Sequence, residues 1–449
     1  MIQVREYGRI TTVASATPSL DCGVVSSATF EWLQDLAAGW KGSDAIAVIN
    51  GRHSLKLGSY VGFLQSPNGE AIEILPKTDM GIEDPQAARK VLQRMLLTAF
   101  GIKPRQATAA DLMRIRQPLH EWIFSQFLSE LQALVSRGLR FDYERIQEES
   151  RFIRGQLEMA RQQRQPPGRE HLFHISHDIF SPNRLENRLL KTALEYVSSV
   201  CKDGENWRLA HELSHRLADV PAEPVPLQTL PQWKSNKLMQ AYETVRPWCE
   251  LILEKLNPNF QQGLHRGISL LFPMEQLFEK YVEASLAKNL AIGTRLKSQA
   301  SSAYLLRHTP INSDIAGNMF QLKPDLLLQS TFGNQILDAK WKLIDQGAFL
   351  GGEKYGISQG DLYQLFAYGH KYQDGSGHMM LIYPKHDAFD QALSPFNYSD
   401  ELVVWAVPFC LESASLVTGN WETFFPFLKV PDLSATIKSD DALDLFISI

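Results

Sequence analysis

The residue types best suited to chemistry gather in residues 320–342, FQLKPDLLLQSTFGNQILDAKWK. Asp325 directly precedes a run of three leucines, and Asp338 and Lys340 lie in a second apolar run. Strand side chains alternate between faces, so Asp338 and Lys340 share one face. A turn around Gly333 and Asn334 would bring Asp325 beside them. The segment therefore predicts a hairpin with two carboxylates and one ammonium at the edge of an apolar sheet.

This combination of side chains predicts a metal-dependent hydrolase. Mg²⁺ prefers oxygen ligands, keeps several waters and takes few ligands from the protein. We expect Asp325 and Asp338 to bind Mg²⁺, with the carbonyl oxygen of Ala339 as a third ligand, and the residue types leave Mn²⁺ open as a substitute. Lys340 would orient or help to deprotonate a water, or offset charge on a phosphate in the transition state. The chemistry implied is hydrolysis of a phosphodiester.

The same residues resemble the signature of PD-(D/E)xK nucleases, here Pro324-Asp325 followed by Asp338-Ala339-Lys340. The upstream segment 274–282 is predicted to be a helix, and the resemblance implies that its Glu279 is an auxiliary metal ligand. The downstream segment 361–368 carries Gln364 and Tyr368 four residues apart on one helical face. That pair resembles the QxxxY element of RecB-like and phage exonucleases, which would position the other groups or the phosphate.

Simpler interpretations of these residues remain open. Asp325 could begin a strand, Asp338 and Lys340 could form a surface ion pair, and Gln364 and Tyr368 could pack their own helix against the sheet. Charged residues inside such apolar runs are costly unless they are paired or bind a ligand, which favours a site. Two other functional classes also stay open: a stand-alone exonuclease of the QxxxY type, and a binding module whose nuclease site is degenerate.

The composition is that of a globular protein with no strong bias. The chain has 449 residues, of which 44% are hydrophobic and 21% charged, and a net charge of −5. A DNA contact would therefore need a local basic face or a partner. The four cysteines are far apart and form no CxxC motif, which predicts unpaired thiols and a cytoplasmic protein. No segment reads as a signal peptide or membrane span, and no GxxxxGK[ST] motif for nucleotide binding is present.

The expected fold class is α/β, or α+β, with two main parts. Residues 1–140 are predicted to form a β-rich and helical domain, 141–233 a linking region of strands and helices, and 234–449 a mixed sheet flanked by helices. Asn68-Gly69 between alternating runs predicts a hairpin, and Asp84-Pro85 predicts a helix start. The Pro-rich segment 220–233 is expected to be a semi-rigid connector, and the tail 430–449 a last helix or strand.

Residues 141–178 are rich in Arg and Gln. We favour a solvated linker or a pair of strands. The alternative is a basic patch for nucleic acid, and the arginines that would form it are Arg151, Arg154, Arg161, Arg164 and Arg169.

A rival motif is HExxH, formed by His211, Glu212 and His215. On a helix both histidines would face one way and could bind zinc, with Glu212 as the base of a metalloprotease. No third ligand helix follows, and leucines at four-residue spacing explain the segment as ordinary packing. We therefore rank zinc proteolysis below the nuclease.

Taken along the chain, the motifs resemble the McrC family, the nuclease subunits of McrBC-type restriction systems for DNA that contains 5-methylcytosine. The matching pieces are LKLGSYVGFLQ and IEILPKT, HDIFSPNRLENRLLKTAL, LFEKYV, KPDLLL, LDAKWK and DLYQLFAY. The resemblance implies an N-terminal part that docks on a hexameric, GTP-hydrolysing AAA+ protein, McrB, and a C-terminal PD-(D/E)xK domain that cuts double-stranded DNA. It also implies that the partner recognises the modified cytosine. The absence of a nucleotide-binding motif here agrees with that division.

Overall fold

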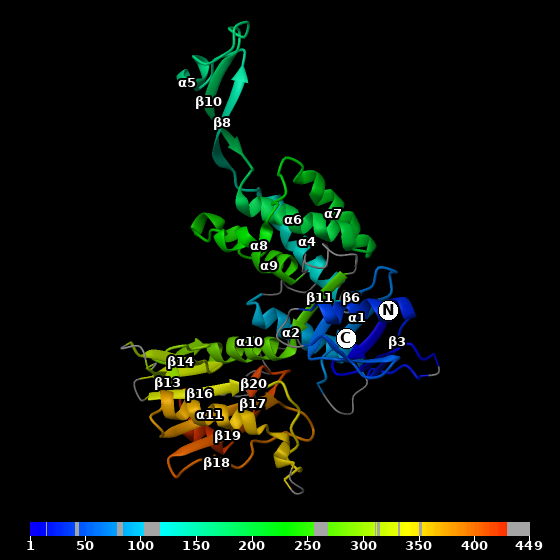
Figure 1. Cartoon of the computed structure of the whole chain (residues 1–449), viewed down its shortest axis with the longest axis vertical. Coiled ribbons are helices and arrows are strands. Elements are labelled where there is room, and N and C mark those ends of the chain that lie inside the picture. The colour runs from blue at the N-terminus through cyan, green and yellow to red at the C-terminus, as the bar shows by residue number, and fades with distance from the viewer. Residues whose placement is uncertain are drawn as a thin grey trace. The chain divides into compact units, whose positions relative to one another are not determined.

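Short alternating apolar runs form strands in the N-terminal part of the computed structural model (Figure 1). The structure describes residues 1–14, 16–40, 45–78, 84–102, 117–255, 268–309, 311, 315–330, 333–349 and 353–428. The chain divides into two compact units, Met1–Leu119 with Phe260–Ile449, and His120–Asn259. The first unit therefore contains both ends of the chain.

The N-terminal part of the first unit contains two four-stranded sheets, with the orders β1-β7-β6-β11 and β3-β2-β5-β4. Its elements are β1 (Ile2–Arg5), β2 (Arg9–Thr11), β3 (Cys22–Val24), α1 (Ser27–Gly39), β4 (Ala47–Ile49), β5 (Ser54–Leu57), β6 (Tyr60–Gln65), β7 (Ala71–Leu75) and α2 (Pro85–Ala99). A turn that contains Tyr7, with a φ of 59°, separates β1 from β2. The expected β6–β7 hairpin is present, and Gly69 in its turn has a φ of 85°.

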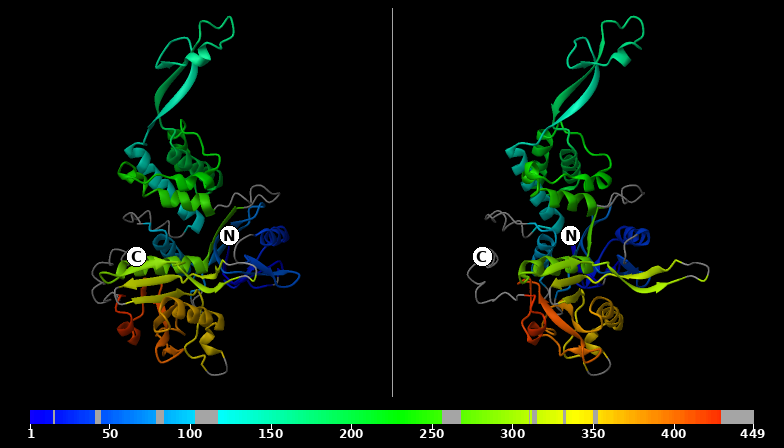
Figure 2. Two further views of the ribbon diagram at one scale, coloured as in Figure 1. Left: turned by 60° about the vertical axis from the view of Figure 1, so that its left-hand side comes forward. Right: turned by 90° about the vertical axis from the view of Figure 1, so that its left-hand side faces the viewer.

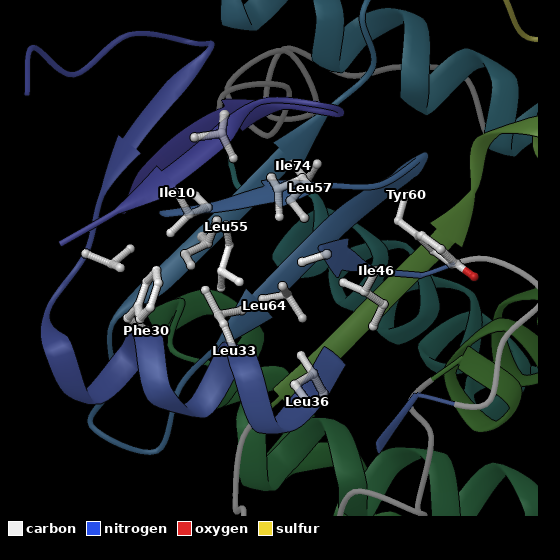
Figure 3. Close-up of a cluster of buried hydrophobic side chains, with 14 of the residues drawn as sticks. Ile10, Phe30, Leu33, Leu36, Ile46, Leu55, Leu57, Tyr60, Leu64 and Ile74 are labelled. Carbon is white, nitrogen blue, oxygen red and sulfur yellow. The ribbon is translucent and has the colours of Figure 1, made fainter. Parts of the chain in front are cut away.

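One apolar core joins these sheets to α1 (Figure 3). Phe30, Leu33 and Leu36 project from one face of α1 toward strand residues such as Leu55 and Leu64, and all five are buried. The spacing of the three α1 residues follows the 3.6-residue period of a helix. Ser26 caps this helix, because its side chain accepts a hydrogen bond from the backbone N–H of Thr29.

A strand from the C-terminal half completes the first sheet. β11 (Ile268–Pro273) pairs antiparallel with β6, residues that are about two hundred positions apart in the chain. The two backbones approach closely at Gly62, where a Cβ atom would lie 1.9 Å from the carbonyl oxygen of Leu270. Gly62 also has a φ of 136°, a conformation that glycine adopts without strain. The N-terminal and C-terminal parts thus fold as one unit.

The C-terminal part is a mixed sheet with the order β12-β15-β16-β17-β19-β18, and β20 pairs with β19. β15 pairs antiparallel with β12 and with β16, whereas β16, β17 and β19 run parallel to one another. The elements are α10 (Met274–Leu286), β12 (Arg295–Ser298), β13 (Ala303–His308), β14 (Gly317–Leu322), β15 (Leu326–Ser330), β16 (Gly333–Ala339), α11 (Gln359–Tyr372), β17 (Gly377–Pro384), β18 (Phe396–Asn397), β19 (Leu402–Cys410) and β20 (Ser415–Leu416). β13 and β14 form a separate two-stranded ribbon.

The second unit combines helices with a three-stranded sheet of order β8-β10-β9. Its elements are α4 (Leu119–Arg137), which begins at the unit boundary, β8 (Asp142–Ser150), β9 (Gln156–Leu157), α5 (Met159–Gln162), β10 (Phe173–Ser181), α6 (Leu185–Val200), α7 (Gly204–Arg216), α8 (Pro226–Thr229) and α9 (Arg246–Lys255). β8 and β10 make a long hairpin that extends from the helices of this unit (Figure 1). The Arg- and Gln-rich region is therefore a pair of strands, as favoured from the sequence.

The division into domains 1–140, 141–233 and 234–449 stays a prediction. One expectation differs from the structure. The Pro-rich segment 220–233 is not a free connector. Val220, Leu230 and Trp233 are buried, and Glu223 makes an ion pair with Arg188. The tail 430–449 lies outside the described residues. All four cysteines are unpaired, as expected.

Candidate functional site

The antiparallel pairing of β15 with β16 brings the PD and DxK motifs together. Leu326 pairs with Leu337, so Asp325 lies one step further along the same register, across from Asp338. The Oδ2 atom of Asp325 accepts a hydrogen bond of 3.0 Å from the backbone N–H of Ala339. The hairpin predicted from the sequence is present, and it fixes the carboxylate of Asp325 against the end of β16.

Asp338 and Lys340 form an ion pair on the face of β16 that Ile336 shares. Lys340 Nζ lies 2.6 Å from Asp338 Oδ2. Asp338 is only 1% exposed, and its Oδ1 atom has no hydrogen-bond partner among the described residues. A surface ion pair is therefore excluded for Asp338, because a buried carboxylate with an unpaired oxygen is costly unless a further group binds there.

The electrostatics of the two carboxyl groups reflect their crowding. Burial raises the pKa of Asp338, and the nearby Asp325 raises it further, while Lys340 opposes both effects. Burial likewise raises the pKa of Asp325, with Glu279 adding to the rise and Lys340 opposing it. For Lys340, burial alone lowers the pKa, but Asp338, Asp325 and Asp361 together raise it above its ordinary value. The site holds more negative than positive charge, so it suits an additional cation.

Glu279 lies on α10, a helix that begins directly after β11. It is half-buried. Burial raises the pKa of Glu279, Lys340 lowers it, and Asp338 raises it. Lys340 and Asp338 therefore act on Glu279 electrostatically, and its role as an auxiliary metal ligand stays a prediction.

Gln364 and Tyr368 lie on α11, against the opposite side of the site. The amide of Gln364 donates a hydrogen bond of 2.6 Å to the hydroxyl of Tyr368. That hydroxyl donates in turn to the backbone carbonyl of Lys323 at 2.9 Å. Burial raises the pKa of Tyr368 to about 12, and Asp338 and Asp325 act in the same direction. Tyr368 is therefore hydrogen-bonded to the segment that leads into Asp325, whereas Gln364 is exposed and contacts Tyr368.

Two residues near the site were not identified as site residues from the sequence. Asp361 lies in the first turn of α11 and affects the pKa of both Asp338 and Lys340. Tyr383 on β17 is fully buried, and its hydroxyl has no hydrogen-bond partner among the described residues. Burial raises the pKa of Tyr383 most, and the charges of Asp361 and Asp338 raise it further. Asp361 stands three residues before Gln364 on the helix, a spacing that could have identified it; Tyr383 gives no such signal.

The donor set fits a hard divalent cation. Among the residues that the structure describes, no three His, Cys, Asp or Glu side chains are arranged as a metal-binding group. Mg²⁺ does not need such a group, since one or two carboxylates and several waters satisfy it. The unpaired, buried Oδ1 of Asp338 and the carboxylate of Asp325 would supply those ligands. In the present arrangement, the ammonium of Lys340 neutralises part of the same charge.

The HExxH residues lie on α7 of the second unit. His211 Nδ1 lies 2.8 Å from the carbonyl oxygen of Trp207, and the two ring centroids are 4.0 Å apart with the rings tilted by 35°. Glu212 pairs with Arg216 at 2.9 Å. Ala210, Leu213 and Leu217 form the buried face of this helix. The segment is explained by packing and surface ion pairing.

The Arg-rich hairpin of the second unit is balanced by acidic residues. Arg154 pairs with Glu148 at 2.7 Å, and Arg169 with Glu149 at 3.5 Å. These pairs agree with the strand-pair interpretation and weaken that of a purely basic patch.

Fold and site together define a mixed α/β protein with one buried carboxylate, one half-buried carboxylate and a lysine at the end of a sheet. Residues 55–384 match the model of the family described as McrBC 5-methylcytosine restriction system component. The chain belongs to this family, in agreement with the McrC resemblance drawn from the motifs.

A solved structure with McrC bound to McrB is similar to this chain in fold. A chain of the refined half-complex from the tetradecameric assembly of Thermococcus gammatolerans McrB AAA+ hexamers with bound McrC has a TM-score of 0.62 and 17% identity, over 94% of this chain and 98% of that chain. A chain of the Thermococcus gammatolerans McrBC complex has a TM-score of 0.46 and 20% identity, over 65% of this chain and 88% of that one. No curated protein sequence matches the chain. In the described ranges, no helix has the length and apolar character needed to cross a membrane.

Proposed function

We propose that this chain is the DNA endonuclease subunit of a modification-dependent restriction complex, with a PD-(D/E)xK site that uses Mg²⁺. The observation that carries the proposal is the convergence of Asp325, Asp338 and Lys340 at one end of the β15–β16 hairpin. Two carboxylates and one ammonium are the groups that metal-assisted phosphodiester hydrolysis needs. The antiparallel hairpin followed by parallel β17 and β19 supports a restriction-endonuclease-like fold for this sheet.

Each residue has a separate proposed role. Asp325 and Asp338 would hold the cation, with the carbonyl of Ala339 and the carboxylate of Glu279 completing or supporting the ligand set. When bound, Mg²⁺ would supply Lewis-acid polarisation of the phosphate and a template for in-line attack. Lys340, kept protonated by its carboxylate neighbours, would stabilise negative charge that develops on the phosphate. Tyr368 would keep Asp325 in position through the carbonyl of Lys323, and Gln364 would orient the Tyr368 hydroxyl.

The proposed partner is an AAA+ GTPase hexamer of the McrB type, and the proposed substrate is double-stranded DNA containing modified cytosine. Support comes from the family to which the chain belongs and from the solved assembly, in which McrC is bound to McrB AAA+ hexamers. The chain itself has no nucleotide-binding GxxxxGK[ST] motif, so GTP hydrolysis would belong to the partner. Such a complex would act on DNA in the cytoplasm.

Cleavage of methylated duplex DNA by the full chain with its AAA+ partner, GTP and Mg²⁺ tests the proposal. Asp338→Asn removes the buried charge at nearly constant volume, and we expect it to lower the cleavage rate by about 100- to 1000-fold. Asp374→Asn is the matched control, because Asp374 is exposed and has a φ of 52°, which asparagine also adopts. Retained cleavage in Asp338→Asn, with partner binding intact in both variants, would overturn the proposal.

A stand-alone exonuclease of the QxxxY type is the second candidate. The hydrogen bond from Gln364 to Tyr368, beside the carboxylate pair, favours it. Digestion of linear DNA by the pure chain with Mg²⁺, without a partner or GTP, would support this candidate over the restriction complex.

A further inference from the structure

The ribbon of β13 and β14 is exposed on both faces. Among the described residues the two strands pair only with each other. Nearly all of their residues outside the base are exposed. Figure 2 (right) shows the ribbon, drawn in yellow-green, extending away from the sheet that carries the candidate site. A two-stranded ribbon on its own is only marginally stable in water. The position of β13 and β14 outside the sheet therefore indicates a binding role.

The ribbon and its base are basic in a chain that is acidic overall. Residues 295–324 contain Arg295, Lys297, Arg307 and Lys323 and one acidic residue, Asp314, whereas the whole chain has a net charge of −5. All four basic side chains are exposed. None of them makes an ion pair with a carboxylate of the described residues, in contrast to the arginines of the β8–β10 hairpin. Exposed cations along this segment that have no carboxylate partner are suited to phosphate groups.

Exposed apolar side chains accompany the basic ones. Leu305 and Leu306 on β13 and Met319 on β14 are each 42% exposed, and Phe320 is 65% exposed. Phe320 has a φ of 58°, which is unusual for a bulky residue, and the strand pairing skips the Leu305–Phe320 position. Backbone strain of this kind is concentrated at binding and catalytic sites. The ribbon thus exposes an aromatic ring to solvent at a position where its two strands are not paired.

Hydrogen bonds connect the base of the ribbon to the elements of the candidate site. β14 ends at Leu322, three residues before Asp325. The Tyr372 hydroxyl donates to the carbonyls of Ala300 and Leu322 at 2.9 Å, and the Tyr368 hydroxyl donates to that of Lys323. The backbone N–H of Gln299 donates to the carbonyl of Asp325 at 2.8 Å. A ligand held by the ribbon would therefore be held in a fixed relation to the carboxylate pair.

We propose that the β13–β14 ribbon binds double-stranded DNA next to the carboxylate pair, with Arg307 and Lys323 on phosphates and Phe320 against the bases. The proposal rests on the proposed nuclease function and adds the element that holds the substrate. The major groove of DNA is about 12 Å wide and admits a two-stranded β-ribbon. Apolar side chains that enter a groove act on the base stack, while Lys and Arg set the position on the backbone. The basic charge and the exposed ring favour DNA over a protein partner.

Salt-dependent DNA binding tests this surface. The full chain with Asp338→Asn, which keeps DNA intact, is titrated into a fluorescent duplex of about 30 base pairs at several KCl concentrations. Arg307→Ala with Lys323→Ala is expected to weaken binding about 10- to 100-fold and to lower the slope of log affinity against log salt by about 2, one for each phosphate contact. Arg52→Ala with Lys56→Ala is the matched control, because both residues are exposed near or on β5, in a sheet that contains no candidate site residue.

Phe320→Gly tests the aromatic contact separately. Glycine accepts the positive φ without strain, so folding should be preserved while the ring is removed. We expect about 10-fold weaker binding, with the salt slope unchanged because no phosphate contact is lost. Sedimentation of the same variants measures self-association, which would change if the ribbon were an interface between chains.

The possible results separate this inference from the nuclease proposal. Equal affinity and slope for Arg307→Ala/Lys323→Ala and its parent would overturn the ribbon as the DNA-binding element, even if the wild-type chain cleaves DNA. Absence of salt-dependent duplex binding by the parent would overturn it as well. Altered sedimentation with unchanged DNA affinity would assign the ribbon to chain association. Weaker DNA binding by the ribbon variants, together with retained cleavage by Asp338→Asn, would support the ribbon as the DNA-binding element. The same result would contradict the proposed catalytic site.

Discussion

The indole N–H of Trp341 donates a hydrogen bond of 2.7 Å to the carboxylate of Glu6, 335 positions away in the chain. Glu6 follows β1, is 1% exposed, and also accepts from the backbone N–H of Lys77 at 2.9 Å. Trp341 directly follows Lys340, and its ring packs on Phe278 of α10 at 5.3 Å. Side-chain alternation directs Trp341 away from the face that carries Asp338. The N-terminal sheet thus contacts the strand end that holds the candidate site.

The first prediction concerns this contact. Trp341→Phe removes the N–H donor but keeps an aromatic ring against Phe278. We expect the free energy of unfolding to fall by about 1–3 kcal/mol, because a buried carboxylate loses a hydrogen-bond partner. We also expect slower DNA cleavage by the folded protein, since the adjoining backbone of Lys340 is less constrained. Urea denaturation and a cleavage assay with the AAA+ partner measure the two effects.

Trp405→Phe is the control for Trp341→Phe. The indole N–H of Trp405, on β19 of the same sheet, donates to His378 at 3.2 Å. This variant should lose stability and keep its cleavage rate. Equal cleavage by both variants would mean that the Trp341 contact is only structural.

The second prediction is a pH dependence of stability that Glu6 causes. Burial raises the pKa of Glu6 from 4.5 to about 7, although the hydrogen bonds from Lys77 and Trp341 oppose the rise. Between these two values the folded chain keeps a proton that the unfolded chain has lost, so stability falls as the pH rises through this range. The loss attributable to Glu6 is about 3 kcal/mol, because one pKa unit corresponds to about 1.4 kcal/mol.

Glu6→Gln removes this titration while keeping an oxygen that can accept from Trp341. We expect the unfolding free energy of the wild type, minus that of the variant, to decrease from pH 4.5 to 7. Urea denaturation of both proteins at several pH values measures the difference. A flat difference for Glu6→Gln would show that Glu6 does not titrate in this range.

The third prediction concerns the support of Asp325. Tyr368→Phe removes the hydroxyl that donates to Lys323 and accepts from Gln364. Loss of this hydrogen bond should cost about 1 kcal/mol of stability and lower the cleavage rate by about 10-fold or more, because small displacements of catalytic groups have large effects. Tyr398→Phe, which loses a hydroxyl bonded to the carbonyl of Leu362, should leave cleavage unchanged. The prediction fails if both variants cleave DNA at the wild-type rate.

The fourth prediction concerns a buried ion pair between β7 and α2. Glu73 is fully buried and accepts from Arg89 Nε at 2.8 Å, from Gln3 at 3.0 Å and from the backbone of Leu119 at 3.2 Å. Arg89→Ala leaves this carboxylate without its charge partner and should cost about 3–5 kcal/mol. Arg216→Ala, which breaks the exposed pair with Glu212, should cost less than about 1 kcal/mol. Thermal unfolding of both variants checks the contrast; similar losses would contradict it.

The sequence alone predicted most elements of the site. The apolar runs around Asp325 and Asp338 predicted the hairpin, because two-residue alternation and a glycine-containing turn are local properties. The helices that carry Glu279, Gln364 and Tyr368 were predicted by their 3.6-residue periodicity. Asp84, Asn68 and Gly69 marked a helix start and a turn through local backbone chemistry.

Only the tertiary structure decided which distant segments meet. Nothing in residues 2–75 indicates that β6 accepts β11 as a neighbour, or that Glu6 reaches Trp341, because strand pairing and burial between remote segments leave no local pattern. The Pro-rich segment 220–233 has a linker's composition, yet it packs because Val220, Leu230 and Trp233 find an apolar surface in the folded second unit. Asp361 and Tyr383 likewise interact electrostatically with Asp338 only because the fold brings α11 and β17 together. Chemistry that depends on alternation and spacing can be predicted from the sequence, whereas burial and long-range pairing are settled by the whole fold.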